Sequence, residues 1–222
     1  MPFIELHGWN GSLSLLMFIG TIFFIWLILV VVSLRKFGTK KTIRYFFPMI
    51  IASLFLEAAA VVSGRYVYPG YFGYLSVIGG SVPLIILLGW SSNLFLFLNL
   101  GKYTVNGFFT QRPLLRITII SVIAGLFGVC LDVLEDPVAH YNNWWVWTQQ
   151  TPTFSFYGVP FSNFLDWFII LFYMALATQL IDQSKYSENR KLLISIISVA
   201  YIGAAIFITH MIVVAIFPMI GK

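Results

Sequence analysis

Charge is scarce in this sequence. Only 9% of its 222 residues are Asp, Glu, Lys or Arg, 59% are hydrophobic, and the mean hydropathy is +0.90. A soluble domain normally carries about a quarter charged residues, so an ordinary water-facing surface is excluded. The single cysteine, Cys130, lies inside an apolar run, which excludes a disulfide and a thiolate metal site. We interpret it as a small buried hydrophobic residue.

Histidine is nearly absent as well. His7, His140 and His210 lie far apart in the sequence, unlike the clustered histidines that membrane di-iron enzymes need. There is no Gly-rich phosphate loop and no nucleophile elbow. The segment DVLED at 132–136 is superficially similar to an aspartate-rich prenyl-diphosphate motif, but no second motif of this kind accompanies it. We therefore expect neither a metal nor a cofactor.

Long apolar runs take up most of the chain. A bilayer core needs about 20 apolar residues per helix, and six runs approach or exceed this length. The predicted helices are 13–34, 47–63, 81–100, 114–134, 161–181 and 192–217. This pattern predicts an all-α, polytopic membrane helix bundle that forms a single transmembrane domain over residues 1–222.

The basic residues indicate an orientation. Of the 13 Lys and Arg residues, all except Arg65 and Lys222 fall in or beside the loops after the first, third and fifth predicted helices. The positive-inside rule then places both termini on the non-cytoplasmic side, and we expect an integral protein of the cytoplasmic (inner) membrane. The net charge of +5 is spread over these short loops rather than along a basic stripe, so a nucleic-acid partner is not expected.

Two long segments on the predicted outer side, 64–80 and 135–160, are rich in aromatic residues. These are Tyr66, Tyr68, Tyr71, Phe72, Tyr74, Tyr141, Trp144, Trp145, Trp147, Phe154, Phe156 and Tyr157. One interpretation is an interfacial belt, in which Trp and Tyr anchor the protein at headgroup depth. The other is a wall for a long apolar ligand that enters from the membrane.

Carboxylates inside the predicted spans are candidate functional residues, because a charge at mid-bilayer costs roughly 2.5–3.5 kcal/mol on insertion scales. Glu57 is expected near mid-membrane, and Asp166 about one turn into the fifth helix. Asp132 and Asp136 are spaced i, i+4 and share a face at the outer end of the fourth helix. Three helices can thus deliver carboxylates to one site, while Glu135 is expected to face water.

Structural roles for the same residues stay open. Glu57 can be a neutral buried acid that is hydrogen-bonded to Asn93 or Ser91. Asp132 and Asp136 can cap an interfacial helix end, although an Asp beside the negative end of a helix dipole is unfavourable, which suits a group that holds a proton. Asp166 lies where the dipole favours an anion, so its role stays undecided. The three other carboxylates, Glu5, Asp182 and Glu188, lie in terminal or cytoplasmic segments and need no special role.

Several stretches resemble the carotenoid biosynthesis membrane protein family, which includes carotenoid 1,2-hydratases and the bisanhydrobacterioruberin hydratase. The similar stretches, in matching order over roughly 50–182, are Glu57, Gly64, Tyr74, Val82-Pro83, Gly89-Trp90, Asp132-Val-Leu-Glu-Asp136-Pro137-Val-Ala, Trp144, Trp145 and Trp147, and Tyr157-Gly-Val-Pro160-Phe-Ser-Asn163-Phe-Leu-Asp-Trp167. Two features depart from the family pattern. Asp166 stands where Gly is expected, and the segment 68–73 is less compact than the usual Pro-Phe-Gly element.

The resemblance implies that water is added to the terminal double bond of an acyclic carotenoid, which gives a tertiary alcohol without a cofactor. Asp132 or Asp136 would be the acid, and Glu57 and Asn163 would position water. The residues expected to line the substrate pocket are Tyr157, Trp145, Trp167, Trp90 and Tyr74. A neutral buried carboxyl suits protonation of an alkene, and aromatic faces suit the resulting cation.

Two other functions use the same features. A proton-coupled carrier would use the acids as a relay, but it needs polar residues through the cytoplasmic half, where Ser195, Ser198 and Asn99 are thin exceptions. A non-catalytic carotenoid-binding protein would explain the aromatics but not the acids. The expected partners are a lipophilic carotenoid, membrane lipid and other carotenoid enzymes.

Overall fold

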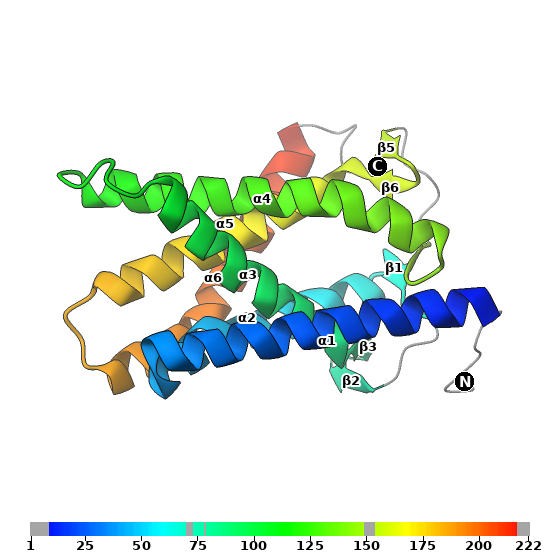
Figure 1. The fold of residues 1–222 in the computed structure, drawn as a ribbon. Coiled ribbons are helices and arrows are strands. Elements are labelled where there is room, and N and C mark those ends of the chain that lie inside the picture. Colours follow the sequence, from blue (N-terminus) through cyan, green and yellow to red (C-terminus); the bar gives the residue numbers. More distant parts are fainter. Residues whose placement is uncertain (1–8, 70–72, 78, 149–153, 217–222) are drawn as a thin grey trace.

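The computed structural model describes residues 9–69, 73–77, 79–148 and 154–216, and six helices dominate this part of the chain (Figure 1). The helices are α1 (Trp9–Phe37), α2 (Thr39–Val62), α3 (Leu84–Thr104), α4 (Pro113–Tyr141), α5 (Phe161–Gln183) and α6 (Glu188–Ile216). All six are long and apolar enough to cross a membrane. The predicted all-α polytopic bundle with six spans is therefore confirmed.

Two helices extend well beyond the apolar runs that predicted them. α2 begins at Thr39 rather than at residue 47, because the basic residues before the apolar run form its first turns. α4 continues through Pro137 to Tyr141 rather than ending at residue 134. The expectation that Asp132 and Asp136 lie at the outer end of this helix is therefore wrong. Both lie inside it, and Asp136 is more than one turn from its end.

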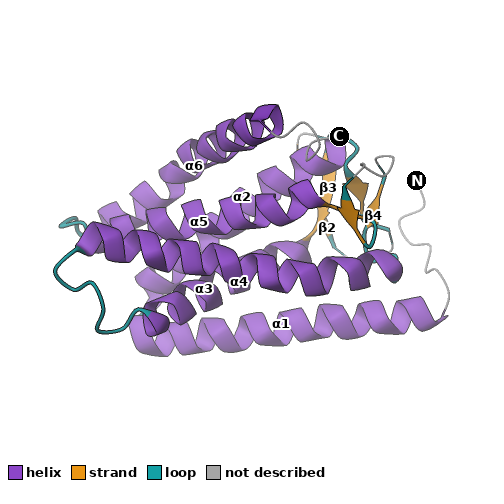
Figure 2. Cartoon of the chain, turned by 90° about the horizontal axis from the view of Figure 1, so that it is seen from above, coloured by secondary structure: helices purple, strands orange, loops and turns teal. Residues whose placement is uncertain are grey.

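The helices form an inner group with α1 and α6 at its edges, along opposite sides of the bundle (Figure 2). α1 packs on α2 and α3, and α6 packs on α2 and α5. α1 exposes many apolar side chains, including Phe24 at 62% and Ile28 at 60%, which would be unfavourable in water and fits lipid. Cys130 on α4 is exposed as well. Its interpretation as a buried residue is wrong, because it lies on a side of α4 that no neighbouring helix covers.

Helices α4 and α5 approach each other closely because α4 presents glycines to α5. A Cβ atom added at Gly125 would lie 2.7 Å from the Phe168 ring and 3.0 Å from the Phe168 carbonyl oxygen. One turn further along, a Cβ at Gly128 would collide with the Leu171 side chain. Small residues at a helix crossing allow close backbone contact in membrane proteins. This contact holds the second half of α4 against the first half of α5.

Three short two-stranded antiparallel ribbons lie together at one end of the bundle, here called the aromatic end (Figure 2). They pair β1 (Tyr66–Val67) with β4 (Val146–Trp147), β2 (Tyr74–Val77) with β3 (Gly80–Pro83), and β5 (Ser155–Phe156) with β6 (Val159–Pro160). The two aromatic-rich segments that were predicted as loops thus contain strands, and β1–β4 joins one segment to the other. Tyr71 and Phe72 lie outside the described residues.

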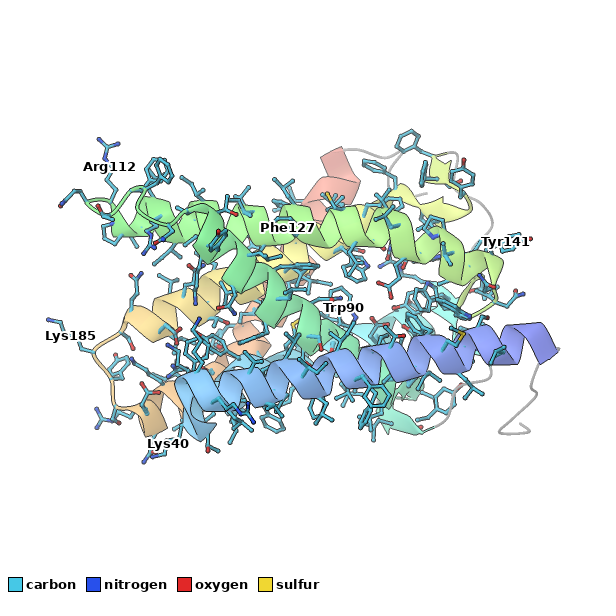
Figure 3. All side chains as sticks on the ribbon, in the orientation of Figure 1. Lys40, Trp90, Arg112, Phe127, Tyr141 and Lys185 are labelled. Carbon is cyan, nitrogen blue, oxygen red and sulfur yellow. The ribbon has the colours of Figure 1, made fainter. Side chains whose placement is uncertain are left out.

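The opposite end of the bundle carries Lys40, Arg112 and Lys185 and is here called the basic end, whereas Tyr141 lies at the aromatic end (Figure 3). Arg44 is buried at the basic end with 2% of its side chain exposed, and it donates to Asp182 at 2.6 Å and to Glu188 at 2.9 Å. Asp182 and Glu188, which were expected to have no special role, therefore join α2 to α5 and α6. The positive-inside prediction would make this the cytoplasmic end.

Candidate functional site

A cavity of about 340 Å³ lies between the helices towards the aromatic end. Side chains from all six helices contribute to its wall, together with residues of β1 and β4. Its polar wall residues are Glu57, Ser63, Arg65, Tyr66, Tyr68, Trp90, Asn93, Glu135, Asp136, Asn163 and Asp166. Most of the remaining wall is aliphatic or aromatic. The volume is typical of a site for a small molecule or for one end of a larger one.

Two aspartates of α4 and one asparagine of α5 form a buried cluster, of which Asp136 and Asn163 line the cavity. Asn163 Nδ2 lies 3.0 Å from both carboxyl oxygens of Asp132 and 2.6 Å from Asp136 Oδ2. Asp132 is fully buried, whereas Asp136 is 3% exposed and reaches the cavity. The close contact of α4 with α5 brings the three side chains together. One amide group thus holds two carboxyl groups side by side, with Asp136 in front and Asp132 behind.

Glu57 lies elsewhere in the same wall and is surrounded by hydrogen-bond donors. Trp90 Nε1 donates to Oε1 at 2.6 Å, Tyr68 donates its hydroxyl to Oε2 at 2.5 Å, and Tyr66 also donates to Oε2. The side chain is buried, at 6% exposure. The Glu57 carboxyl group is the acceptor in all three hydrogen bonds, so Glu57 lies within a cage of three neutral donors.

Tyr66 belongs to the β1–β4 ribbon, in which it pairs with Trp147, and this pairing places its hydroxyl at Glu57. Burial raises the pKa of Tyr66 above its ordinary value, and the charge of Glu57 and the hydrogen bond to it raise the pKa further. The phenol therefore keeps its proton and remains a donor. The first aromatic-rich segment thus supplies two donors, Tyr66 and Tyr68, to an acid that lies on α2.

Aromatic faces make up another part of the wall. The rings of Trp90 and Trp167 lie 4.2 Å apart between centroids, and both line the cavity. Trp145 and Trp147 line it from the second aromatic-rich segment. The indole faces offer negative electrostatic potential without a nucleophilic lone pair, which suits a cationic intermediate.

Arg65 and Asp166 form an ion pair in the cavity wall. Arg65 Nη1 lies 2.9 Å from Asp166 Oδ2, and Arg65 Nη2 lies 3.5 Å from the Ser162 hydroxyl. The charge of Asp166 is thus neutralised by Arg65, which lies on the side of the predicted membrane opposite to most Lys and Arg residues. The pair connects the segment after α2 with the first turns of α5.

The structure brings most of the predicted site residues to this cavity. Glu57, Asp136, Asn163, Trp90, Trp145 and Trp167 line it, and Asp132 lies directly behind. Tyr74 lies outside the wall, where its hydroxyl donates to the Tyr68 carbonyl oxygen at 2.8 Å. Tyr157 is not among the lining residues. It is 77% exposed and occupies the turn between β5 and β6, with a positive φ of 49°.

Two local expectations differ from the structure. Glu57 does not bind Ser91, whose hydroxyl donates to the Leu88 carbonyl oxygen at 2.9 Å. Its partners are Tyr66, Tyr68 and Trp90 instead. Glu135, which was expected to face water, lies in the cavity wall beside Asp136, because α4 continues past this position.

Sequence reasoning missed the roles of Arg65, Tyr66 and Tyr68. A signal was present, because a buried acid needs donors and the nearest ones in the sequence follow α2 directly. The pairing of β1 with β4 carried no comparable signal, since each strand has two residues. The long-range partner of Tyr66 was therefore not predictable from its own segment.

The chemistry of the wall is that of carboxyl, amide, phenol and indole groups. Within the described ranges no group of three or more His, Cys, Asp and Glu side chains is arranged to hold a metal ion. The wall can donate a proton, accept a proton and stabilise a cation.

Comparison with known proteins gives this site a context. A family model described as "Carotenoid biosynthesis protein" matches residues 7–220. The chain belongs to this family. The predicted membership is therefore confirmed, and the family places the chain in carotenoid metabolism. Searches of curated proteins and of solved structures gave no match.

Proposed function

We propose that this member of the carotenoid biosynthesis family adds water to the terminal double bond of an acyclic carotenoid. The product is a tertiary alcohol, and the reaction needs no cofactor. The observation that carries the proposal is the pair of carboxyl groups, Asp132 and Asp136, held by the Asn163 amide at the wall of an apolar and aromatic cavity. The opposite requirement, a proton acceptor, is met by Glu57.

The acid is assigned to the aspartate pair. Two carboxylates side by side in a protein interior repel each other, and a single proton between them relieves this repulsion. Asn163 donates from the same nitrogen to both groups, so it fixes the pair without supplying a positive charge. Asp136 is the member that reaches the cavity, and it is therefore the proton donor in the proposal. Asp132, which lies behind Asp136, shares this proton and returns it to Asp136.

The cation that follows needs stabilisation without capture. The proton from Asp136 bonds to the less substituted carbon of the terminal alkene, and positive charge develops on the tertiary carbon. Trp90 and Trp167 both line the cavity, and a cation over an indole gains about 0.5–2 kcal/mol. The anionic Glu57 adds longer-range attraction within the same wall.

Water attacks this cation, and Glu57 receives the released proton. A carboxylate offers about four acceptor positions, and the cage of Trp90, Tyr66 and Tyr68 uses three of them. The remaining position suits a water molecule. A C–O bond forms, one O–H bond of the water breaks, and the proton returns from Glu57 to the aspartate pair through solvent. The sum is one alkene plus one water, and the enzyme is unchanged.

The substrate would react one end at a time. An extended carotenoid is comparable in length to the ~30 Å hydrocarbon core, and a cavity of about 340 Å³ can take only one end of it. Ile22 of α1 and Ile206 of α6, the two edge helices, contribute to the wall. The rest of the carotenoid would therefore leave the cavity between helices and lie in the bilayer.

The test is to express the chain in cells that make lycopene or a related acyclic carotene and to analyse the pigments by mass. A product heavier by one water is expected. Asp136→Asn and Asp132→Asn should each lower it by at least about a hundredfold, in line with loss of general acid catalysis. Glu188→Gln is the matched control, because this exposed carboxylate at the basic end does not line the cavity and contacts Arg44 instead.

Other outcomes separate the competing functions. An unchanged pigment profile with several acyclic carotenes, while the protein inserts normally, would contradict the proposal. Proton flux in proteoliposomes that is lost in Asp136→Asn would instead favour a carrier. Carotenoid that co-purifies unaltered would favour a binding protein.

A further inference from the structure

A second cavity, of about 670 Å³, lies at the basic end of the bundle. Its wall is formed by the end of α1, the start of α2, the end of α3, the start of α4 and the end of α5. Its lining residues are distinct from those of the first cavity, towards the aromatic end, and the proposed reaction makes no use of them.

The charge of this wall is strongly positive. Four cationic side chains line it, Lys36, Lys41, Lys102 and Arg116, and Asp182 is the one carboxylate that the described wall contains. The cations come from four different helices, α1, α2, α3 and α4. Four like charges around one cavity are unfavourable unless an anion shares the space.

Asp182 supplies only one negative charge, which Arg44 binds most closely and which Lys41 and Lys102 share. Arg44 Nη2 lies 2.6 Å from Asp182 Oδ1, and the Tyr45 hydroxyl donates to Oδ2 at 2.9 Å. Lys41 and Lys102 lie at 3.6 Å and 4.0 Å from the same oxygen, which is longer than a charge-assisted hydrogen bond. The other carboxylate nearby, Glu188, also binds Arg44.

Arg116 gives an independent sign of an absent acceptor. Its Nε atom is buried, and no hydrogen-bond partner for it exists among the described residues. No described carboxylate forms an ion pair with this guanidinium. A buried donor without a partner carries a desolvation penalty. The same guanidinium lines the cavity, so an anion that enters the cavity can meet its charge.

From these observations we infer that the basic-end cavity binds a phosphate group. A phosphate presents several acceptor oxygens and one or two negative charges, which matches Arg116, Lys102, Lys41 and Lys36 around a common space. Leu96, Leu100 and Ile120 add an apolar part to the wall. The phosphate of an anionic lipid headgroup and a soluble phosphate share this chemistry, and basic pockets between membrane helices are known to bind lipid headgroups.

The experiment uses the full-length chain in a neutral detergent. Phosphatidylglycerol, phosphatidylcholine and inorganic pyrophosphate are titrated separately, and binding is followed by native mass spectrometry for the lipids and by calorimetry for pyrophosphate. Arg116→Gln and, independently, Lys102→Gln are the test variants. Arg112→Gln and Lys185→Gln are matched controls, because both residues lie at the same end but do not line the cavity (Figure 3).

Each test variant should weaken binding by about tenfold or more, as expected for loss of one charge-assisted contact, while the controls stay within about twofold. Binding of phosphatidylglycerol but not pyrophosphate assigns a lipid headgroup, and the converse assigns a soluble phosphate. No binding of either probe, or equal loss in the test and control variants, would overturn the inference. Because Arg116→Gln can affect folding, the thermal unfolding of this variant is measured as well. If Arg116→Gln is unfolded, the binding measured for Lys102→Gln serves as the test.

Discussion

The Asn163 amide and the Asp136 carboxyl are joined across two helices by a hydrogen bond of 2.6 Å. The same nitrogen also binds both oxygens of Asp132, so the donor group of Asn163 points at the acid pair. Within the proposed reaction, Asn163 therefore holds the acids in place rather than positioning the water. In the proposed reaction Glu57, whose carboxylate has one acceptor position left, positions the water instead.

Removal of this amide should affect both stability and product. In Asn163→Ala, two buried carboxyl groups lose their shared donor, and we expect the free energy of unfolding to fall by about 1–3 kcal/mol. Hydrated product should fall by at least about tenfold more than the amount of folded protein. Asn142→Ala is the control, because this half-buried side chain at the end of α4 bonds only the Val138 carbonyl oxygen among described groups. Product that simply follows the amount of folded protein would contradict a role in the reaction.

The donor cage around Glu57 can be tested with substitutions that keep an aromatic ring at each position. Trp90→Phe removes the Nε1–H donor, and Tyr68→Phe removes a hydroxyl, while each keeps an aromatic ring in the wall. Each variant should lower the rate of hydration about tenfold, because a weakened cage holds the anion less precisely. Phe97→Leu, a change in an aromatic residue outside the cavity wall, serves as the packing control. Rates are measured as product per folded protein, and equal rates in all three variants would rule out this role of the cage.

Tyr66 gives the stability a defined dependence on pH. Its pKa in the folded protein is raised above the ordinary 10.0, so the folded state holds this proton more tightly than the unfolded state. The contribution is fully present below about pH 10 and decreases as the pH rises above it, because the unfolded chain then binds fewer protons than the folded one. The difference in melting temperature between the wild type and Tyr66→Phe should therefore shrink above about pH 10. A difference that stays constant up to about pH 11 would show that the hydroxyl does not titrate in this way.

The close contact between α4 and α5 predicts a large effect for a small substitution. Gly125→Ala would place a methyl group 2.7 Å from the Phe168 ring, and the nearby backbone oxygen limits relaxation. We expect destabilisation of about 1–3 kcal/mol from overpacking. Gly203→Ala on α6 is the matched control, because nothing lies within 4 Å of its added Cβ. It should be neutral or stabilising by up to about 1 kcal/mol through helix propensity. Equal unfolding free energies for the two variants would contradict the close packing.

The Arg65–Asp166 pair should show measurable coupling. Arg65→Gln and Asp166→Asn are combined in a double-mutant cycle, and the unfolding free energy of each variant is measured. Because the side chains are 24% and 14% exposed, a coupling of about 1 kcal/mol is expected rather than the larger value of a dry ion pair. Additive effects of the two substitutions would show that the ion pair does not stabilise the wall.

The sequence was most informative where a feature repeats over many residues. Six apolar runs predicted six helices, and the i, i+4 spacing of Asp132 and Asp136 predicted their shared face. The ends of the helices were less predictable, because charged residues such as Lys40 and Arg44 can occupy the first turns of a membrane helix at headgroup depth. Pro137 lies inside α4, because its missing N–H removes one hydrogen bond without ending the helix.

The partners of the buried carboxylates were beyond sequence reasoning. That Asn163 binds both aspartates depends on how closely α4 and α5 approach, which Gly125 and Gly128 decide through packing. That Tyr66 reaches Glu57 depends on a ribbon of two residues per strand, too short to leave a periodic pattern. Tyr157 shows the reverse case. It lies in a motif similar to the family signature, yet its positive φ and its exposure place it in a turn away from the cavity.

The pairing of β1 with β4 has a consequence for the order of biosynthesis. Both α3 and α4 lie between Tyr66 and Trp147 in the sequence, and translation proceeds from the N-terminus. When Glu57 enters the membrane with α2, the strand that pairs with Tyr66 has not yet been synthesised. In the nascent chain, the β1–β4 pairing that places Tyr66 at Glu57 can therefore form only after α4 has been inserted. Truncated chains that end before residue 146 should insert their helices but leave the donor cage around Glu57 incomplete.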